Sequence, residues 1–387
     1  MSDVDRFLRC IEDIASVVRA DAVESERNGR LGDATMAALR ASGLMRMLVA
    51  PEYGGAALRL EETFPIVRAM SRVHGSTGWN VHIGATTVAM ASDIADDGAR
   101  RIVLGGDAIV AGTLQFVNIR VERVAGGYTF DGVATFLSGS AHASWLAIGG
   151  WLHVDGAPQF ARAGMPRIVR GVVPIDRVTL QDTWHVSGLR ATSSHDATLD
   201  ALFIPDEFIC TPDGDALAAD DPARRMPLFS RFGAGVASVG LGIAEGALDA
   251  MYASAATKTP FGSTKPLRER TEVQIAFARA RALVESGSAY LDRAWHDAHA
   301  QLDRGDELTP EDQALLRLAY VTAADHASTA TDILVRAAGT AGLYESDGIE
   351  RCWRDANAVN KHVTVAARSL DRVGRILLGL PAPPGPI

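Results

Sequence analysis

The hydrophobic pattern of the 387-residue chain changes character twice, and each change marks a predicted boundary. Up to residue 106 the apolar positions recur at helical spacing, as in the stretch 5–24, where charged residues separate them. A second stretch, 33–49, begins at an Asp that can cap a helix and ends at the helix breakers of 50–58. Residues 1–106 are therefore predicted to form a helical domain.

Residues 107–212 alternate apolar and polar positions, which is typical of strands that bury one face. The turn sequences Ala-Gly-Gly-Tyr at 125–128 and Phe-Asp-Gly at 130–132 come at short spacing and favour hairpins. This region is predicted to be a small antiparallel β domain.

The remaining residues, 213–387, return to helical spacing in segments separated by Pro- and Gly-containing breaks. Four such segments predict a four-helix bundle. The tail 380–387 is rich in Pro, cannot continue a helix and is expected to be an extended arm. The fold class is thus mainly α with a central β domain. The predicted bundle segments are 231–257, 268–302, 310–342 and 349–380.

Composition and charge narrow the possible partners. The formal net charge is −9 and no block of Lys or Arg is present, so neither nucleic acid nor an anionic membrane surface is expected. Three well-separated cysteines predict neither a disulfide framework nor a metal site. The N-terminal stretch is amphipathic rather than a signal sequence, and the apolar runs are shorter than the ~20 residues of a membrane helix. A cytoplasmic protein is expected.

Two bundle segments are rich in Ala and Gly on more than one face, at 233–256 and 317–342. Small residues let helices approach closely, and burial on several faces is typical of an oligomer core. The pattern predicts a homotetramer.

Five short motifs occur in a fixed order along the chain. They are Ala-Pro-Glu-Tyr-Gly-Gly at 50–55, a strand pair at 126–150, a Trp-x-x-x-Gly-x-Arg stretch at 184–208, Lys-Thr-Pro-Phe-Gly at 258–262, and a Gly-rich turn with Arg-Asp at 337–356. Together with the order of domains, this series resembles the acyl-CoA dehydrogenase superfamily over nearly the whole chain. The resemblance implies the fold of that family, with an N-terminal helical domain, a β domain and a C-terminal bundle.

The stretch 183–196 is the strongest candidate for a flavin site. The hydroxyls of Thr192, Ser193 and Ser194 can satisfy flavin carbonyls or a phosphate without bulk, and Trp184 offers a wide apolar face. From the residues alone, a solvated hairpin with a buried anchoring Trp is an equal alternative. The resemblance favours the flavin site and implies a set of cofactor-binding residues: Ser138, Gly139, Ser140, Trp184, Arg190, Thr192, Ser194, Lys258, Phe261, Gly339 and Thr340.

Lys258 stands where dehydrogenases of this family have the Arg that grips the FAD pyrophosphate across a dimer. Lys meets a phosphate as a point charge and lacks the bidentate geometry of Arg. This departure favours a loosely held, diffusible flavin, reduced FMN or FAD, over a permanently bound one.

The region after the Arg-Asp signature separates two kinds of enzyme. Acyl-CoA dehydrogenases need a carboxylate base, yet no Glu or Asp lies between Asp355 and Asp371, and Glu245 is a candidate base only by its place on another helix. His362 in this region, and the sequence Ser-Gly-x-x-x-Ala from Ser138, instead resemble the two-component flavin-dependent monooxygenases. Their substrate-lining helix resembles 74–85, which implies a substrate pocket lined by Trp79, Asn80 and His82.

The resemblance implies an oxygenase that takes reduced flavin from a separate reductase and forms a C4a-hydroperoxide. Ser138 would contact flavin N5, and His362 would act as acid or base because an imidazole pKa is near 7. The substrate would be a small aromatic or amino compound, oxygenated on carbon or nitrogen. No Gly-x-Gly-x-x-Gly follows a predicted strand, so the reducing power must come from a partner.

Other interpretations stay open at this stage. One is an acyl-CoA dehydrogenase or oxidase with FAD and an unrecognised base, and another is a non-enzymatic binding or scaffold protein. His362 could be a packing residue, and Arg354 with Asp355 is expected to be a structural pair that holds the last two helices. His296 and His299 lack an evident third metal ligand and are expected on an exposed face.

Overall fold

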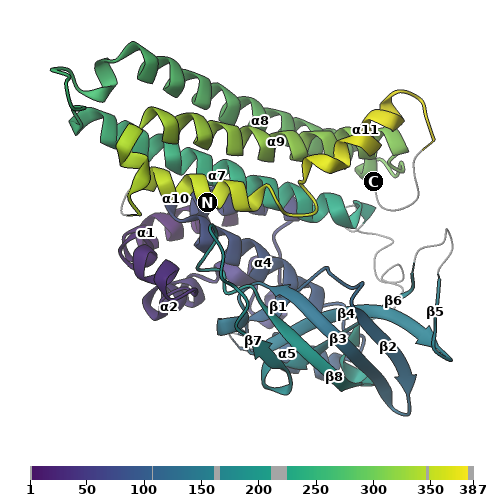
Figure 1. Ribbon diagram of the computed structural model, residues 1–387. Helices are drawn as coiled ribbons and strands as arrows, with labels where there is room; N and C mark the ends of the chain where they lie inside the picture. Colours follow the sequence, from purple (N-terminus) through teal and green to yellow (C-terminus); the bar gives the residue numbers. More distant parts are fainter. Residues whose placement is uncertain (1, 107, 161–165, 211–224, 346–347, 382–387) are drawn as a thin grey trace.

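The computed structural model describes residues 2–106, 108–160, 166–210, 225–345 and 348–381. Figure 1 shows a bundle of long helices on one side, a β-sheet on the other, and helix α4 between them. The first helix begins at a capping box, in which the Ser2 hydroxyl accepts the Asp5 N–H and the Asp5 carboxylate accepts the Ser2 N–H. The N-terminal helices are α1 (Asp3–Arg27), α2 (Asp33–Ser42), α3 (Leu60–Val73), α4 (Gly75–Ala91) and α5 (Asp97–Leu104).

Helix α4 is buried along almost its whole length because it is built largely from small residues. A Cβ on Gly78 would lie 2.0 Å from the Ser71 Oγ, so glycine there allows α4 to pack closely against α3. This packing places α4 against both the bundle helix α7 and strand β1 (Val110–Gly112).

The β domain is one sheet, in the order β7-β8-β3-β2-β4-β6-β9. Most of its pairs are antiparallel, as expected, but β1 and β2 both pair with β4 in parallel, so the sheet is mixed. The reason is that β3 runs back along β2, and the short segment 138–144 then starts β4 at the same end as β2. The remaining strands are β2 (Ile119–Val124), β3 (Gly127–Leu137), β4 (Trp145–Val154), β5 (Ala157–Pro158), β6 (Ile168–Pro174), β7 (Thr179–Gln181), β8 (His195–Pro205) and β9 (Ile209–Cys210).

The C-terminal region is the expected helix bundle, with one difference. The segment 349–380 is not one helix: α10 ends at Val359, residues 360–366 form turns, and α11 follows. The consecutive β-branched residues 363–365 disfavour helix, and the Thr364 hydroxyl bonds to the His362 ring instead. The bundle helices are α7 (Leu228–Thr257), α8 (Thr271–Asp303), α9 (Pro310–Ala337), α10 (Gly348–Val359) and α11 (Leu370–Leu377).

Helix α7 is long and apolar enough to cross a membrane, the one such helix among the described residues. Of its most apolar 18-residue window, 83% is buried inside the protein. It is therefore the core helix of the fold, which explains its Gly and Ala content.

The predicted domain boundaries are consistent with the order of elements but are not tested by it. Helix α5 ends at Leu104 and β1 begins at Val110; β9 ends at Cys210 and α7 begins at Leu228. The boundaries at 106/107 and 212/213 involve residues 107 and 211–224, which lie outside the described residues. The same is true of 382–387, most of the predicted extended arm.

Candidate active site

A chain of hydrogen bonds joins α4 to two loops of the β domain, the loop 138–144 after β3 and the loop 182–194 before β8. The indole Nε1 of Trp79 donates to the Ser138 Oγ at 3.0 Å, and Ser138 Oγ lies 2.8 Å from Ser194 Oγ. Ser194 Oγ lies 2.7 Å from Thr192 Oγ1, which donates to the Leu189 carbonyl at 2.9 Å. We call Ser138, Ser194 and Thr192 the hydroxyl chain. All three side chains are buried.

The backbone holds these two loops together. The Gly139 N–H donates to the Thr192 carbonyl at 2.8 Å, and the Ser140 hydroxyl donates to the Ser193 carbonyl at 2.7 Å. Gly139 has φ +79° and Ser193 has φ +42°, so both loops turn sharply at this contact. The predicted residues Ser138, Gly139, Ser140, Thr192 and Ser194 are thus brought together.

The predicted substrate-pocket residues Trp79, Asn80 and His82 are all buried on α4. The Asn80 amide donates to the Ala191 carbonyl at 3.4 Å and to the Ser76 carbonyl at 3.0 Å, so it ties α4 to the loop 182–194. The His82 Nε2 is buried without a hydrogen-bond partner among the described residues. Burial lowers the pKa of His82 to about 3, with a further contribution from His362.

His362 also contacts Trp79, through the rings rather than the indole N–H. Its ring meets the Trp79 ring edge-on at 5.5 Å between centroids, and its Nδ1 lies 2.8 Å from the Thr364 Oγ1. Burial lowers its pKa to about 4, so the imidazole is neutral at pH 7. The expectation that the pKa of His362 lies near 7 was therefore wrong. A neutral imidazole can still accept or donate a proton at its ring nitrogens.

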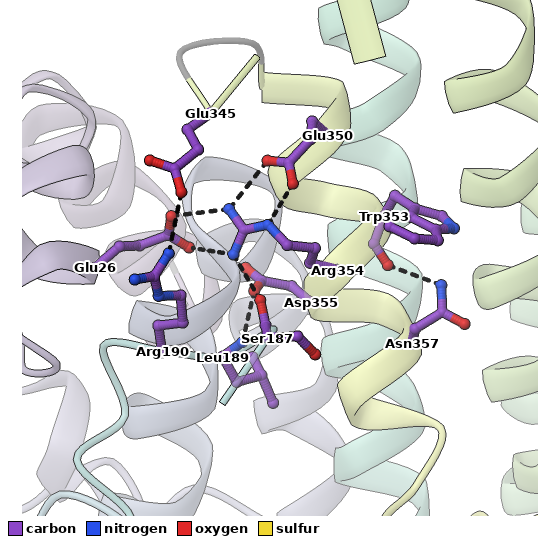
Figure 2. Close-up of polar contacts among 10 residues, drawn as sticks. All are labelled: Glu26, Ser187, Leu189, Arg190, Glu345, Glu350, Trp353, Arg354, Asp355 and Asn357. Carbon is purple, nitrogen blue, oxygen red and sulfur yellow. Dashed lines mark hydrogen bonds and ion pairs between the residues drawn. The ribbon is translucent and has the colours of Figure 1, made fainter. Parts of the chain in front are cut away.

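The turn at Leu189 anchors the loop 182–194 to α10, as Figure 2 shows. The Leu189 N–H donates to the Asp355 carboxylate at 2.6 Å, and the Leu189 carbonyl also accepts the Trp184 Nε1 at 3.1 Å. Leu189 has φ +54°, an unusual value for a branched residue. A Cβ on Gly188 would lie 2.1 Å from the Arg354 carbonyl, so glycine is needed for this close approach.

Arg354 extends the anchor to α1. Its guanidinium bonds to the Glu26 carboxylate at 3.0 Å, to Glu350 at 2.6 Å and to the Ser187 carbonyl at 2.7 Å (Figure 2). The pair Arg354–Asp355 therefore ties α10 to α1 and to the β domain. The expectation that it holds the last two helices together was wrong, because the partners come from distant segments that local patterns do not reveal.

Both Asp355 and Leu189 lie in motifs noted above, but the motifs did not predict the contact between them. One signal was present in the sequence: Asp355 shares a helix face with Cys352, Ala356 and Val359, at the i, i+3, i+4, i+7 spacing of an apolar stripe. An Asp in such a stripe must find a buried partner.

Trp184 is half-buried, with its ring edge against Phe136 at 6.2 Å. Its indole N–H is bound to the Leu189 carbonyl, so it anchors the turn. Whether it also walls a flavin ring stays a prediction. Arg190 makes an ion pair with Glu345 at 3.3 Å, and Glu345 follows helix α9 in the chain by eight residues.

The other predicted cofactor residues lie apart from the hydroxyl chain. Lys258 and Phe261 belong to the α7–α8 connection, which Figure 1 places at the end of the bundle opposite α11. Phe261 is fully exposed. Gly339, with φ +63°, and Thr340 lie in the short helix Gly339–Leu343 after α9. Within one chain the predicted cofactor set therefore falls into two groups, and the role of the second group stays a prediction.

Glu245, the candidate dehydrogenase base, lies elsewhere. It lines a cavity of about 510 Å³ between α1, α3 and α7, together with Arg68 and Arg72. Trp79, Ser138 and His362 do not line this cavity. Burial raises the pKa of the Glu245 carboxyl, but its position does not suit a base for this site.

No group of three or more potential metal ligands occurs within the described ranges. His296 is exposed as expected, but His299 is buried. The His299 ring packs between Arg59 and the Asp303 carboxylate, which lies 3.1 Å from its Nδ1. The expected exposed position was wrong for His299, because these contacts come from α3's N-terminal cap and its own helix.

Comparison with known proteins identifies the family. Profiles of the acyl-CoA dehydrogenase N-terminal and C-terminal domains match residues 10–101 and 234–367. A pigment production hydroxylase from Rhodococcus sp. is 30% identical over 373 residues, which cover 93% of each chain. The chain belongs to the acyl-CoA dehydrogenase superfamily. Its branch is that of the oxygenase components of two-component flavin-dependent monooxygenases, and the predicted fold and branch are confirmed.

Two further members of this branch are similar over nearly their whole length. The oxygenase component of an FADH(2)-dependent resorcinol hydroxylase from Rhizobium sp. is 27% identical over 400 residues, covering 97% of this chain and 94% of that protein. The crystal structure of 3-HSA hydroxylase from Rhodococcus sp. RHA1 has a TM-score of 0.85 at 25% identity and covers 97% of both chains.

A reduced flavin fits the residues of this monooxygenase. The hydroxyl chain offers small polar groups where a flat polar ring edge can bind, and the Ser193 Oγ is buried without a hydrogen-bond partner among the described residues. A buried, unsatisfied hydroxyl next to three others indicates a place for a polar ligand. Reduced flavin is the cofactor of this enzyme, as predicted.

Proposed function

We propose that this oxygenase takes reduced FMN or FAD from a separate flavin reductase and hydroxylates a small aromatic or amino compound on carbon or nitrogen. The observation that supports it most is the position of Trp79. Its indole N–H bonds to Ser138 and its ring meets His362, so it brings the two predicted catalytic residues to one place. Neither contact involves a carboxylate, which a dehydrogenase would need.

Each residue of the proposed site has a role that suits its chemistry. Ser138 would meet the reacting edge of the ring at N5, with Thr192 and Ser194 behind it. His362, neutral at pH 7, would hold or move a proton at its Nε2, because its Nδ1 is engaged by Thr364. When bound, reduced flavin supplies the two electrons with which one atom of dioxygen leaves as water while the other enters the substrate.

The walls of the site would exclude water and select the substrate. Trp79 and Asn80 are buried against the β-domain loops, and the unpartnered Nε2 of His82 is suited to bind a polar group of the substrate. An aromatic ring with a hydroxyl or amino group has the required shape and polarity. A buried histidine held neutral cannot repel an amine by charge.

A homotetramer is proposed, but the part 233–244 of the expected segment 233–256 is not its interface. Residues 233–244 of α7 are buried inside the chain, so their small side chains serve internal packing. Exposed apolar residues instead gather near the α7–α8 connection and the end of α9: Tyr252, Phe261, Leu343 and Tyr344. An interface there would bring Lys258, Phe261, Gly339 and Thr340 of one copy toward the flavin of another. A cytoplasmic location, where a reductase can supply flavin, belongs to the same proposal.

The test is to bind anaerobically reduced FMN or FAD, admit oxygen in the presence of indole, resorcinol and aniline in turn, and look for oxygenated product by mass spectrometry. Incorporation of ¹⁸O from labelled dioxygen would support the proposal. Acyl-CoA-dependent reduction of a dye, without any hydroxylated product from a wider panel, would instead support the dehydrogenase alternative.

A further inference from the structure

The direction of every hydrogen bond in the hydroxyl chain follows from its two ends. The Leu189 carbonyl can only accept, so the Thr192 hydroxyl must use its single hydrogen to donate to it. The Ser194 hydroxyl must then donate to Thr192, and the Ser138 hydroxyl must donate to Ser194. At the other end the Trp79 indole can only donate, and it donates to Ser138.

Ser138 can therefore form one further hydrogen bond, and only as an acceptor. A hydroxyl has one hydrogen and two acceptor lone pairs. The hydrogen is engaged by Ser194, and one lone pair is engaged by Trp79. What Ser138 can still offer to a ligand is an acceptor, and it has no hydrogen left to donate.

The end of the chain is fixed by distant parts of the fold. The Leu189 peptide is held on its N–H side by Asp355 at 2.6 Å, and its carbonyl also accepts the Trp184 indole at 3.1 Å. The same carbonyl also accepts the Thr192 N–H at 3.1 Å, so it would keep two donors if the Thr192 hydroxyl turned away. Reversing the chain would instead leave the Thr192 and Leu189 oxygens 2.9 Å apart with no hydrogen between them, and because two facing lone pairs repel, the order of donors is stable.

This order matters because the two redox states of flavin differ at N5. Reduced flavin carries a hydrogen on N5 and donates, whereas oxidised flavin has a bare lone pair there and accepts. We propose that Thr192 and Ser194 are positioning residues that turn the Ser138 hydroxyl into an obligate acceptor and so make the site select reduced over oxidised flavin. The inference rests on the proposed function, in which Ser138 meets flavin N5.

The test compares dissociation constants for oxidised and dithionite-reduced FMN and FAD, measured anaerobically, in the wild type and in Ser194→Ala. Without Ser194 the Ser138 hydrogen is free to turn toward N5 and donate to the oxidised ring. The ratio of oxidised to reduced dissociation constants should fall by roughly fivefold to tenfold, which is the net effect of about one hydrogen bond. The reduction potential of the bound flavin should shift downward to match, which is a readout independent of activity.

Thr192→Val provides a second variant of nearly the same shape, should Ser194→Ala fold poorly. It frees the Ser194 hydrogen, so the chain can reverse and the ratio should fall as well. Ser144→Ala is the matched control. Ser144 is a serine of the same loop, but its hydroxyl donates to the Ile109 carbonyl and stands outside the hydroxyl chain, so its loss should leave the ratio unchanged.

An unchanged ratio in both Ser194→Ala and Thr192→Val would overturn the inference, as would a wild type that binds both redox states equally. The proposed function is judged separately, by whether the wild type forms oxygenated product with a reductase. A wild type that forms oxygenated product but shows no redox preference would support the proposed function and contradict this inference.

Discussion

The Asp355 carboxylate of α10 holds the backbone N–H of Leu189 at 2.6 Å, and through it the turn from which the hydroxyl chain starts. The relationship links the bundle to the β domain at a residue with φ +54°. His362 follows seven residues later, in the turn after α10. The helix that precedes His362 is thus tied to the loop that carries the hydroxyl chain.

The first prediction concerns this contact. Asp355→Asn keeps an oxygen that can accept the Leu189 N–H, whereas Asp355→Leu leaves that N–H buried and unpaired. We expect the Leu variant to lose about 1–3 kcal/mol more of the free energy of unfolding than the Asn variant, measured by urea titration. The Leu variant should also bind reduced flavin more weakly. Equal stability of the two variants would show that the Leu189 contact contributes little.

The second prediction concerns pH. Burial, with the nearby Glu26, raises the pKa of Asp355 from 3.8 to about 7. The folded protein then binds a proton between pH 4 and 7 that the unfolded chain has released, so this group stabilises the fold at acid pH and loses that effect as the pH rises through 7. Asp355→Asn has no such group.

The free energy of unfolding of Asp355→Asn, minus that of the wild type, should therefore increase from pH 4.5 to pH 7, by at most about 1.4 kcal/mol per pH unit. Taking the difference between two proteins removes the effect of the buried histidines, which have the opposite sign. His362 and His82 have lowered pKa values, so they stabilise the fold above pH 6.5 and destabilise it as the pH falls through about 4 and 3. A difference that stays constant with pH would contradict the raised pKa of Asp355.

The sequence predicted the parts of the site that local patterns encode. The strand pair follows from alternation and turn residues, whereas the site role of the hydroxyls at 192–194 and of the helix over 74–85 was favoured by the family resemblance. The parallel pairing of β2 with β4 and the break at 360–366 do not, because both depend on contacts made after the elements form. The Asp355–Leu189 contact is of the same kind: it joins segments far apart in the sequence, and only the Asp in an apolar stripe hinted at it.

The third prediction concerns assembly. Light scattering at micromolar concentration should give a tetramer, and Leu343→Asp with Tyr344→Asp should shift it to smaller species, because charges are costly in a buried apolar interface. Ile102→Asp is the matched control, since Ile102 is also an exposed apolar residue but lies on α5. A monomeric wild type would contradict the proposed tetramer, and a loss of assembly in Ile102→Asp alone would place the interface elsewhere.

The last prediction concerns His362, which separates an oxygenase from a dehydrogenase. His362→Ala should leave flavin binding nearly intact, because the proposed ring contacts come from the β-domain loops and α4. Hydroxylation should fall by roughly 10²–10⁴-fold, the usual effect of losing a positioned acid or base, and hydrogen peroxide should replace product. Burial holds the His362 pKa at about 4. When product yield per flavin oxidised is plotted against pH, we therefore expect no inflection near pH 6.5 that is present in the wild type and absent in His362→Ala.

Glu245→Gln is the counterpart in the same experiment. Glu245 lines a separate cavity, so its loss should change neither product nor peroxide yield in an oxygenase. In a dehydrogenase that uses Glu245 as its base, the same change would abolish acyl-CoA-dependent dye reduction, while His362→Ala would barely alter it. Unchanged coupling in His362→Ala, together with acyl-CoA turnover that depends on Glu245, would overturn the oxygenase assignment of these two residues.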